Sequence, residues 1–232
     1  MASRLPLVLS VVGWFVLGKA GASQQIPPFK TLDEVSSFVQ TYYQRPRPEL
    51  IADLIRSLPA AGLAQRPNAT PPMTGFFSEV FAANPARMAE WQPLISAQDA
   101  STRGLLEQAV ALSKSGGVLD LTGHSASLND MYWGAFFATG RTVFLQKLVD
   151  QLRYVDERED EALFLAGATA KWSLASNAES HDLVRWILKS PTLTTDQRTQ
   201  ALISELLTEG PAQVKQEMAA VVQKQREAGK WR

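Results

Sequence analysis

Apolar residues recur at helical spacing along nearly the whole chain after residue 30. The apolar positions of "TLDEVSSFVQTYY" share one helix face: Leu32, Val35, Phe38, Val39 and Tyr42. Thr31 stands just before this face and Glu34 follows three residues later, which is the spacing of a capping box. "PELIADLIRSL" repeats the helical pattern, and "PAAGLAQRPNATPP" then interrupts it. We therefore predict an N-terminal helix pair and a proline- and alanine-rich connector over residues 23–72.

Residues 73–232 continue as a series of helical segments with short breaks between them. Short connections place consecutive helices side by side and antiparallel. Segments that begin near Ser127, Glu159 and Thr195 follow one another at about the interval of stacked helical hairpins. Asn84 and Gly140 are each expected to end a helix in the left-handed conformation. The pattern predicts an all-α fold of stacked antiparallel helix pairs, either helical-repeat (solenoid-like) or an irregular multi-helix bundle.

The first 22 residues follow a different pattern. A short basic start, "MASR", precedes an apolar run over residues 5–18, and "AGA" at residues 20–22 has the small residues that signal peptidase needs. The run is shorter than the roughly 20 residues of a membrane-spanning helix. We predict a cleavable secretory signal peptide over residues 1–22. Lys19 lies close to the cut, so an uncleaved N-terminal anchor is the alternative.

A processed chain of this kind is expected to be periplasmic or secreted, most simply in a bacterial envelope, with no membrane insertion after cleavage. Removal of Arg4 and Lys19 from a chain with 23 basic and 23 acidic residues leaves a small acidic excess. Nothing in this balance favours binding to nucleic acid. The chain has no cysteine and only two histidines, so thiolate and imidazole-rich metal sites are excluded. We expect no cofactor.

The segment "GGVLDLTGHSAS", residues 116–127, resembles the turn that presents a catalytic serine in hydrolases. Residues 118–121 would form its strand, Ser125 would be the nucleophile and His181 the base. Such a turn requires a multi-stranded sheet, and no other convincing strand is present in the sequence. The alternative is a glycine-rich loop in which Ser125 or Ser127 caps the following helix. His181, near a helix start beside Asp182, is then expected to be exposed.

A second enzymatic alternative is a glycan-cleaving enzyme with a pair of carboxylates. Glu79 and Glu90 lie in an aromatic neighbourhood, and two carboxylates within about 5–10 Å can hydrolyse a glycosidic bond. Helical surfaces carry many carboxylates, so this spacing alone does not define a site.

Aromatic residues are concentrated in "SLNDMYWGAFFATG". Tyr132 and Phe136 form one i,i+4 pair, and Trp133 and Phe137 form another. This wide aromatic face is either core or, in part, a partner-binding face of the kind that helical solenoids present. Trp231 is expected in a frayed terminus. The sequence therefore predicts an exported, non-catalytic protein–protein interaction module that binds another envelope or secreted protein, with an envelope hydrolase as the alternative.

Overall fold

The computed structural model describes residues 29–63, 66 and 68–231, and this part of the chain is all-α, with no strand. This confirms the predicted fold class. The α-helices are α1 (Leu32–Thr41), α2 (Ile51–Ala61), α3 (Thr70–Ala83), α4 (Met88–Ser96), α5 (Ala100–Lys114), α6 (Ala126–Thr139), α7 (Thr142–Gln151), α8 (Glu161–Ser180), α9 (Asp182–Leu188) and α10 (Gln197–Glu227). Short 3₁₀ turns connect several of them: η1 (Tyr42–Gln44), η2 (Pro48–Leu50), η3 (Pro85–Arg87), η4 (Val118–Asp120) and η5 (Leu152–Tyr154).

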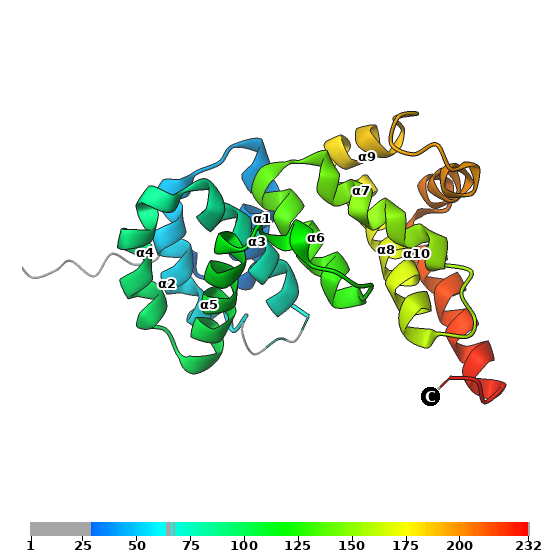
Figure 1. The fold of residues 1–232 in the computed structure, drawn as a ribbon, viewed down its shortest axis with the longest axis horizontal. Coiled ribbons are helices and arrows are strands. Elements are labelled where there is room, and N and C mark those ends of the chain that lie inside the picture. Colours follow the sequence, from blue (N-terminus) through cyan, green and yellow to red (C-terminus); the bar gives the residue numbers. More distant parts are fainter. Residues whose placement is uncertain (1–28, 64–65, 67, 232) are drawn as a thin grey trace, which may run out of the picture.

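The helices form an elongated molecule with α6 near its middle (Figure 1). Helices α1 to α5 lie at one end, and α7 to α10 lie at the other. Helices α3 and α6 form the largest helix–helix contact, although α4 and α5 lie between them in the chain. Beyond α6 the packing follows the chain more closely, since α6 contacts α7 and α8 contacts both α9 and α10. The arrangement is thus an irregular multi-helix fold with a more regular C-terminal half.

Helices α3 and α6 are in close backbone contact at two glycines, Gly75 and Gly134. A Cβ on Gly75 would lie 2.1 Å from the carbonyl oxygen of Met131, and a Cβ on Gly134 would lie 1.8 Å from that of Pro72. Real Cβ atoms do not approach backbone this closely, so both positions require glycine. The two contacts also show that the helices run antiparallel. Their backbones touch at the centre of the fold.

Local signals in the sequence explain most helix ends. Thr31 and Glu34 form the predicted capping box of α1, and the Asp99 side chain accepts hydrogen bonds from the first turn of α5. Gly140 ends α6 in the left-handed conformation, with φ of 67°. The corresponding prediction for Asn84 is wrong: its φ is −131°, and its side-chain amide donates to the carbonyl of Val80. The helices that end at Asn84 and at Gly140 therefore end in different conformations.

The N-terminal helix pair shares the core of the rest of the chain. Phe38 and Tyr42 form an aromatic series with Phe76 of α3, with ring centroids 5.5 and 5.2 Å apart along the series. The connector is shorter than predicted. Pro59 lies within α2, and α3 begins at Thr70 because prolines are well tolerated in a first helical turn.

Helix α10 is divided by a kink at Gly210, whose φ of 74° and ψ of 170° are not helical. Glycine permits this conformation, and Pro211 begins the second half without needing a hydrogen-bonded N–H. We call residues 211–231 the C-terminal arm. Trp231 ends the arm in contact with Phe164 of α8, 4.9 Å between ring centroids, and is only 6% exposed. The expectation of a frayed terminus is wrong, because the arm folds back along α8.

The predicted signal peptide of residues 1–22 lies outside the described residues. Among the helices that the structure describes, none combines the length and the apolar character needed to cross a membrane.

Candidate functional site

Ser125 is a helix cap. Its hydroxyl oxygen accepts a hydrogen bond from the backbone N–H of Leu128 at 3.1 Å, and α6 begins at the next residue. The segment before it, residues 118–120, is a 3₁₀ turn rather than a strand. The neighbouring His124 contacts Gln151 at 3.1 Å and Tyr154 at 3.0 Å, which ties the loop to the end of α7. The nucleophile-turn hypothesis is therefore wrong, and the capping alternative is confirmed.

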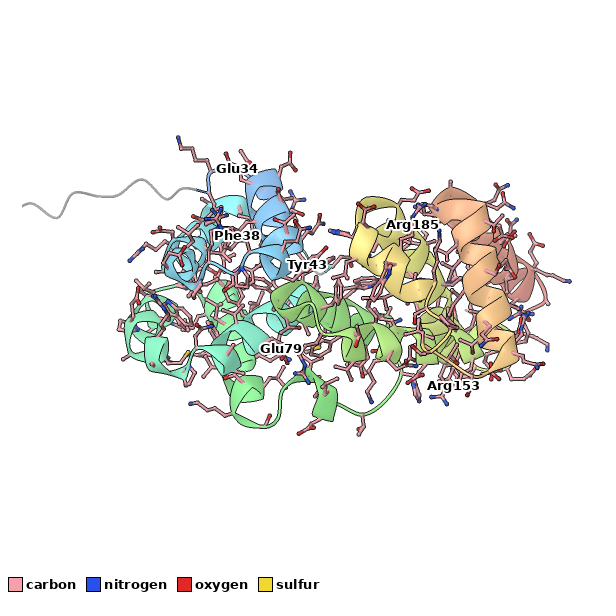
Figure 2. The ribbon with its side chains drawn as sticks, turned by 90° about the horizontal axis from the view of Figure 1, so that it is seen from above. Glu34, Phe38, Tyr43, Glu79, Arg153 and Arg185 are labelled. Carbon is pink, nitrogen blue, oxygen red and sulfur yellow. The ribbon has the colours of Figure 1, made fainter. Side chains whose placement is uncertain are left out.

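His181 lies far from Ser125. It joins α8 to α9, and its ring lies 5.2 Å from that of Phe137, near the opposite end of α6 from Ser125. Twelve residues of helix, or roughly 18 Å, separate the two ends. His181 is 6% exposed, which corrects the expectation of a surface residue. Its Nδ1 lies 3.4 Å from the hydroxyl of Tyr43, which is labelled in Figure 2. Burial lowers the pKa of His181. The two residues cannot form a catalytic pair.

Glu79 and Glu90 do not share a site. Glu79 is 8% exposed and lies beside Gly117, while its carboxylate is 3.8 Å from the Arg141 guanidinium (Figure 2). Burial raises the pKa of Glu79, and the backbone N–H of Val118 and the charge of Arg141 oppose that rise. Glu90 is half exposed and pairs with Arg87 on the surface. The proposed carboxylate pair is therefore not assembled.

The aromatic face of α6 is core. Tyr132, Trp133, Phe136 and Phe137 are 2%, 4%, 0% and 6% exposed. The indole N–H of Trp133 donates to Ser173 of α8 at 2.9 Å, and the Phe136 ring packs 5.3 Å from that of Tyr43. The reason is that α1, α3, α7 and α8 all contact α6, so no side of it is left open for a partner. The interpretation of these four residues as a partner-binding face is corrected.

An open apolar surface occurs instead between α8 and the C-terminal arm. Here Leu165 is 38% and Trp172 is 40% exposed, and they border a groove of about 350 Å³. We call this the α8–α10 groove, which is lined by Phe164, Leu165, Ala168, Thr169, Trp172, Lys215, Met218, Ala219 and Val222. The Lys215 ammonium lies over the Trp172 ring, 5.9 Å from its centroid. Lys215 is the only charged residue in the lining.

A buried lysine lies at the junction of α8 and the two halves of α10. Lys171 has a side chain only 2% exposed, and it pairs with Glu205. Carboxylate oxygens of Glu209 and Glu217 lie 3.8 and 3.7 Å from its ammonium. The three carboxylates are close enough together to hold a cation, and the lysine ammonium already occupies that role. We interpret this cluster as the clasp that fixes the kink of α10.

The third large apolar residue exposed in the described part of the chain is Trp186 of α9, at 70%. Leaving roughly 150 Å² of an indole in water forgoes about 4 kcal/mol of burial free energy. A hollow of about 410 Å³ adjoins it, between α7, α9 and the loop 189–194.

Comparison of the chain with protein-family models, curated proteins and solved structures finds no match. Function is therefore inferred from the surface of this molecule alone.

Sequence reasoning missed these surfaces for identifiable reasons. Tryptophans within helical segments are usually expected in the core, but Trp172 and Trp186 each lie one residue away from the buried stripe of their helix. Lys171 sits within the apolar run "LFLAGATAKWSLA", and a lysine there signals a buried ion pair with acidic residues elsewhere. The partners, on α10, could not be chosen from the sequence because several acidic residues are available there.

Proposed function

We propose that this chain is an exported, non-catalytic module that binds another envelope or secreted protein, and that the α8–α10 groove is its binding surface. The observation that carries the proposal is the exposure of Leu165 and Trp172, two turns apart on α8, along one groove. The export part depends on the leader-like sequence of residues 1–22.

The groove has the form of a receptor for a helix. Its floor comes from α8, and the stripe Lys215, Met218, Ala219 and Val222 of the arm provides one wall at helical spacing. An amphipathic helix can place apolar residues at i, i+3/i+4 and i+7 into such a groove. Trp172 provides the large aromatic contact that dominates many interfaces.

The charge on the rim indicates the partner's chemistry. Lys215 makes no ion pair within the described residues, and its ammonium lies over the face of Trp172. A carboxylate on the partner would both neutralise Lys215 and lie beside the aromatic ring. We therefore propose a partner helix with an apolar face bordered by Asp or Glu.

A photo-crosslinking amino acid at Ala219, in full-length protein expressed in its own cells, tests this proposal. Ala219 lines the groove, whereas the neighbouring Ala220 is exposed, points about 100° away around the helix and does not line the groove, so it is the matched control position. We expect an adduct from position 219 that maps to an apolar helical segment of an exported protein, with none from position 220. Trp172→Glu should abolish the adduct, and Trp186→Ala should not affect it.

No adduct from position 219, or equal adducts from both positions, would exclude the groove as the binding surface. An adduct that persists with Trp172→Glu would mean that the crosslinked protein is a neighbour rather than a ligand.

A further inference from the structure

The hollow beside Trp186 differs in chemistry from the α8–α10 groove. Trp186 is 70% exposed, the most exposed of the large apolar residues that the structure describes. The hollow of about 410 Å³ beside it carries four hydroxyl or amide side chains in its lining: Thr142, Gln146, Ser190 and Thr192. Ile187 and Leu193 are among its apolar residues. None of the residues that line it is charged.

The four polar side chains come from two directions. Thr142 and Gln146 lie one turn apart on α7, whereas Ser190 and Thr192 belong to the loop after α9. The Ser190 and Thr192 hydroxyls lie 2.9 Å apart, which fixes the loop. Gln146 donates through its amide nitrogen to Asp150 at 3.0 Å, which leaves its carbonyl oxygen as an acceptor. Donors and acceptors therefore surround a flat aromatic surface.

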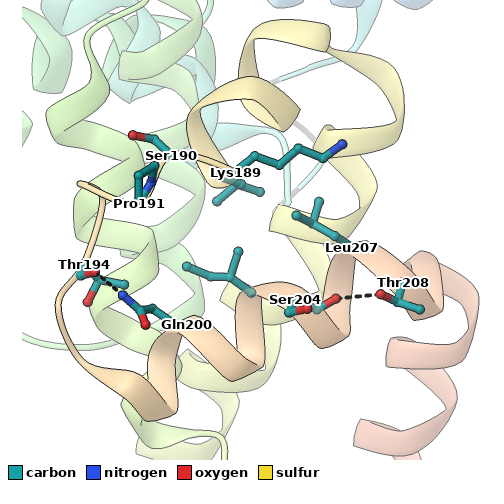
Figure 3. A pocket seen from close by; sticks show the side chains of 10 residues that line it. Lys189, Ser190, Pro191, Thr194, Gln200, Ser204, Leu207 and Thr208 are labelled. Carbon is teal, nitrogen blue, oxygen red and sulfur yellow. Dashed lines mark hydrogen bonds between the residues drawn. The ribbon is translucent and has the colours of Figure 1, made fainter.

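A second hollow continues this neutral polar surface on the α10 side of the same loop. It measures about 550 Å³ and shares Ser190 with the first (Figure 3). Thr194, Gln200, Ser204 and Thr208 also line it, and Gln200 donates to the carbonyl of Thr194 at 2.9 Å. Its one charged residue is Lys189. The two hollows adjoin each other at Ser190.

An exposed indole surrounded by neutral polar side chains favours some classes of ligand over others. A phosphate or carboxylate ligand would require arginine or lysine in the Trp186 hollow. A purely apolar ligand would leave the Gln146 carbonyl oxygen and the remaining hydrogen-bonding capacity of the hydroxyls unused. A neutral sugar ring satisfies both halves of the site. Its C–H face packs on an aromatic ring, and its hydroxyls exchange hydrogen bonds with short polar side chains.

We propose that the Trp186 hollow binds a neutral oligosaccharide, with one pyranose ring stacked on Trp186. The adjoining hollow, beyond Ser190, receives the next sugar of the chain. This site is separate from the protein-binding groove, and the proposal does not depend on it.

The test is an array of neutral tetrasaccharides of glucose, galactose, mannose and N-acetylglucosamine, with anionic counterparts, probed with the full chain. We expect binding to at least one neutral glycan. Titration calorimetry with that glycan should show affinity at least 10-fold weaker for Trp186→Ala and unchanged for Trp172→Ala. Gln146→Ala should weaken binding several-fold. Trp186 is 70% exposed, so Trp186→Ala should unfold at nearly the same temperature as the wild type.

The proposal is overturned if no neutral glycan binds or if only anionic glycans bind. It is also overturned if Trp186→Ala binds as tightly as the wild type. The crosslinking result at position 219 does not affect these outcomes, so the two proposals can fail separately.

Discussion

At the scale of single residues, the absence of a side chain at Gly75 and Gly134 decides how the centre of the molecule packs. A methyl group at Gly134 would overlap the carbonyl oxygen of Pro72, which belongs to backbone and cannot rotate away. Gly104 of α5 provides a contrast, because nothing lies within 4 Å of the position that its Cβ would take.

We expect Gly134→Ala to lower the free energy of unfolding by about 3 kcal/mol, since α3 and α6 would have to separate. Gly104→Ala should raise it by about 0.5–1 kcal/mol, because alanine is the better helix former at an open position. Urea denaturation of both variants measures these changes. Similar values for the two substitutions would contradict the close helix crossing.

Asp130 of α6 gives a second prediction at this scale. Burial raises its pKa to about 6, and no neighbouring cation opposes the shift. The folded state therefore binds more protons than the unfolded state between about pH 4 and pH 6. The contribution of this carboxyl to the free energy of unfolding falls as the pH rises through that range.

Asp130→Asn should stabilise the protein by about 1–2 kcal/mol at pH 7, a value reduced for partial solvent contact, and by almost nothing below pH 4. Thermal unfolding at both pH values measures the difference. A gain of equal size at both pH values would refute the assignment to burial.

At the scale of elements, the clasp between α8 and the two halves of α10 depends on one lysine. Removal of Lys171 alone leaves three neighbouring carboxylates without their cation. The loss of one partner from a buried ion pair typically destabilises by 3–5 kcal/mol. Because the glutamates are partly exposed, we expect the lower end of this range.

Lys171→Met should therefore lower the free energy of unfolding by about 3 kcal/mol. The same substitution should lower it by less than about 1 kcal/mol when Glu205, Glu209 and Glu217 are all glutamine. Denaturation of the four proteins in this cycle measures the coupling. Equal losses in both backgrounds would show that the lysine acts through its hydrocarbon chain and not through its charge.

Helix boundaries could be predicted from the sequence, whereas contacts between helices could not. Helix boundaries followed from local chemistry: the capping box at Thr31, the N-cap at Ser125 and the glycine that ends α6 at Gly140 were all predictable. The α3–α6 pair was not, because α4 and α5 intervene and periodicity does not say which faces meet. His181 was misplaced for a related reason. The residue that covers it, Tyr43, lies at the end of α1 and far away in the sequence.

At the scale of the whole molecule, the C-terminal arm is less firmly attached than the rest. A continuous core extends from Phe29 to Val214 at the start of the arm, whereas the end of the arm packs on a separate small cluster around Phe164 and Trp231. Two surface ion pairs, Arg226 with Glu161 and Lys230 with Glu159, assist it. Such exposed pairs contribute about 0–1 kcal/mol each.

We expect the amides of residues 213–224 to exchange hydrogen through local opening, with free energies several kcal/mol below those of α3 and α6. Trp231→Ala should speed exchange in the arm and leave α3 and α6 unchanged. Native-state hydrogen exchange read by mass spectrometry distinguishes these segments. Protection of the arm equal to that of α6 would show a single cooperative unit instead.

The glycine crossing at Gly75 and Gly134 also bears on ancestry. Side chains of the apolar core can change size together while the volume is kept, so most of this sequence is free to diverge. Where two backbones are in contact, as at Gly75 and Gly134, no larger side chain can be accommodated by a change elsewhere. Proteins of common descent with this one would then be recognised by a pair of small residues on two helices separated by an inserted helical hairpin, long after overall sequence identity had faded.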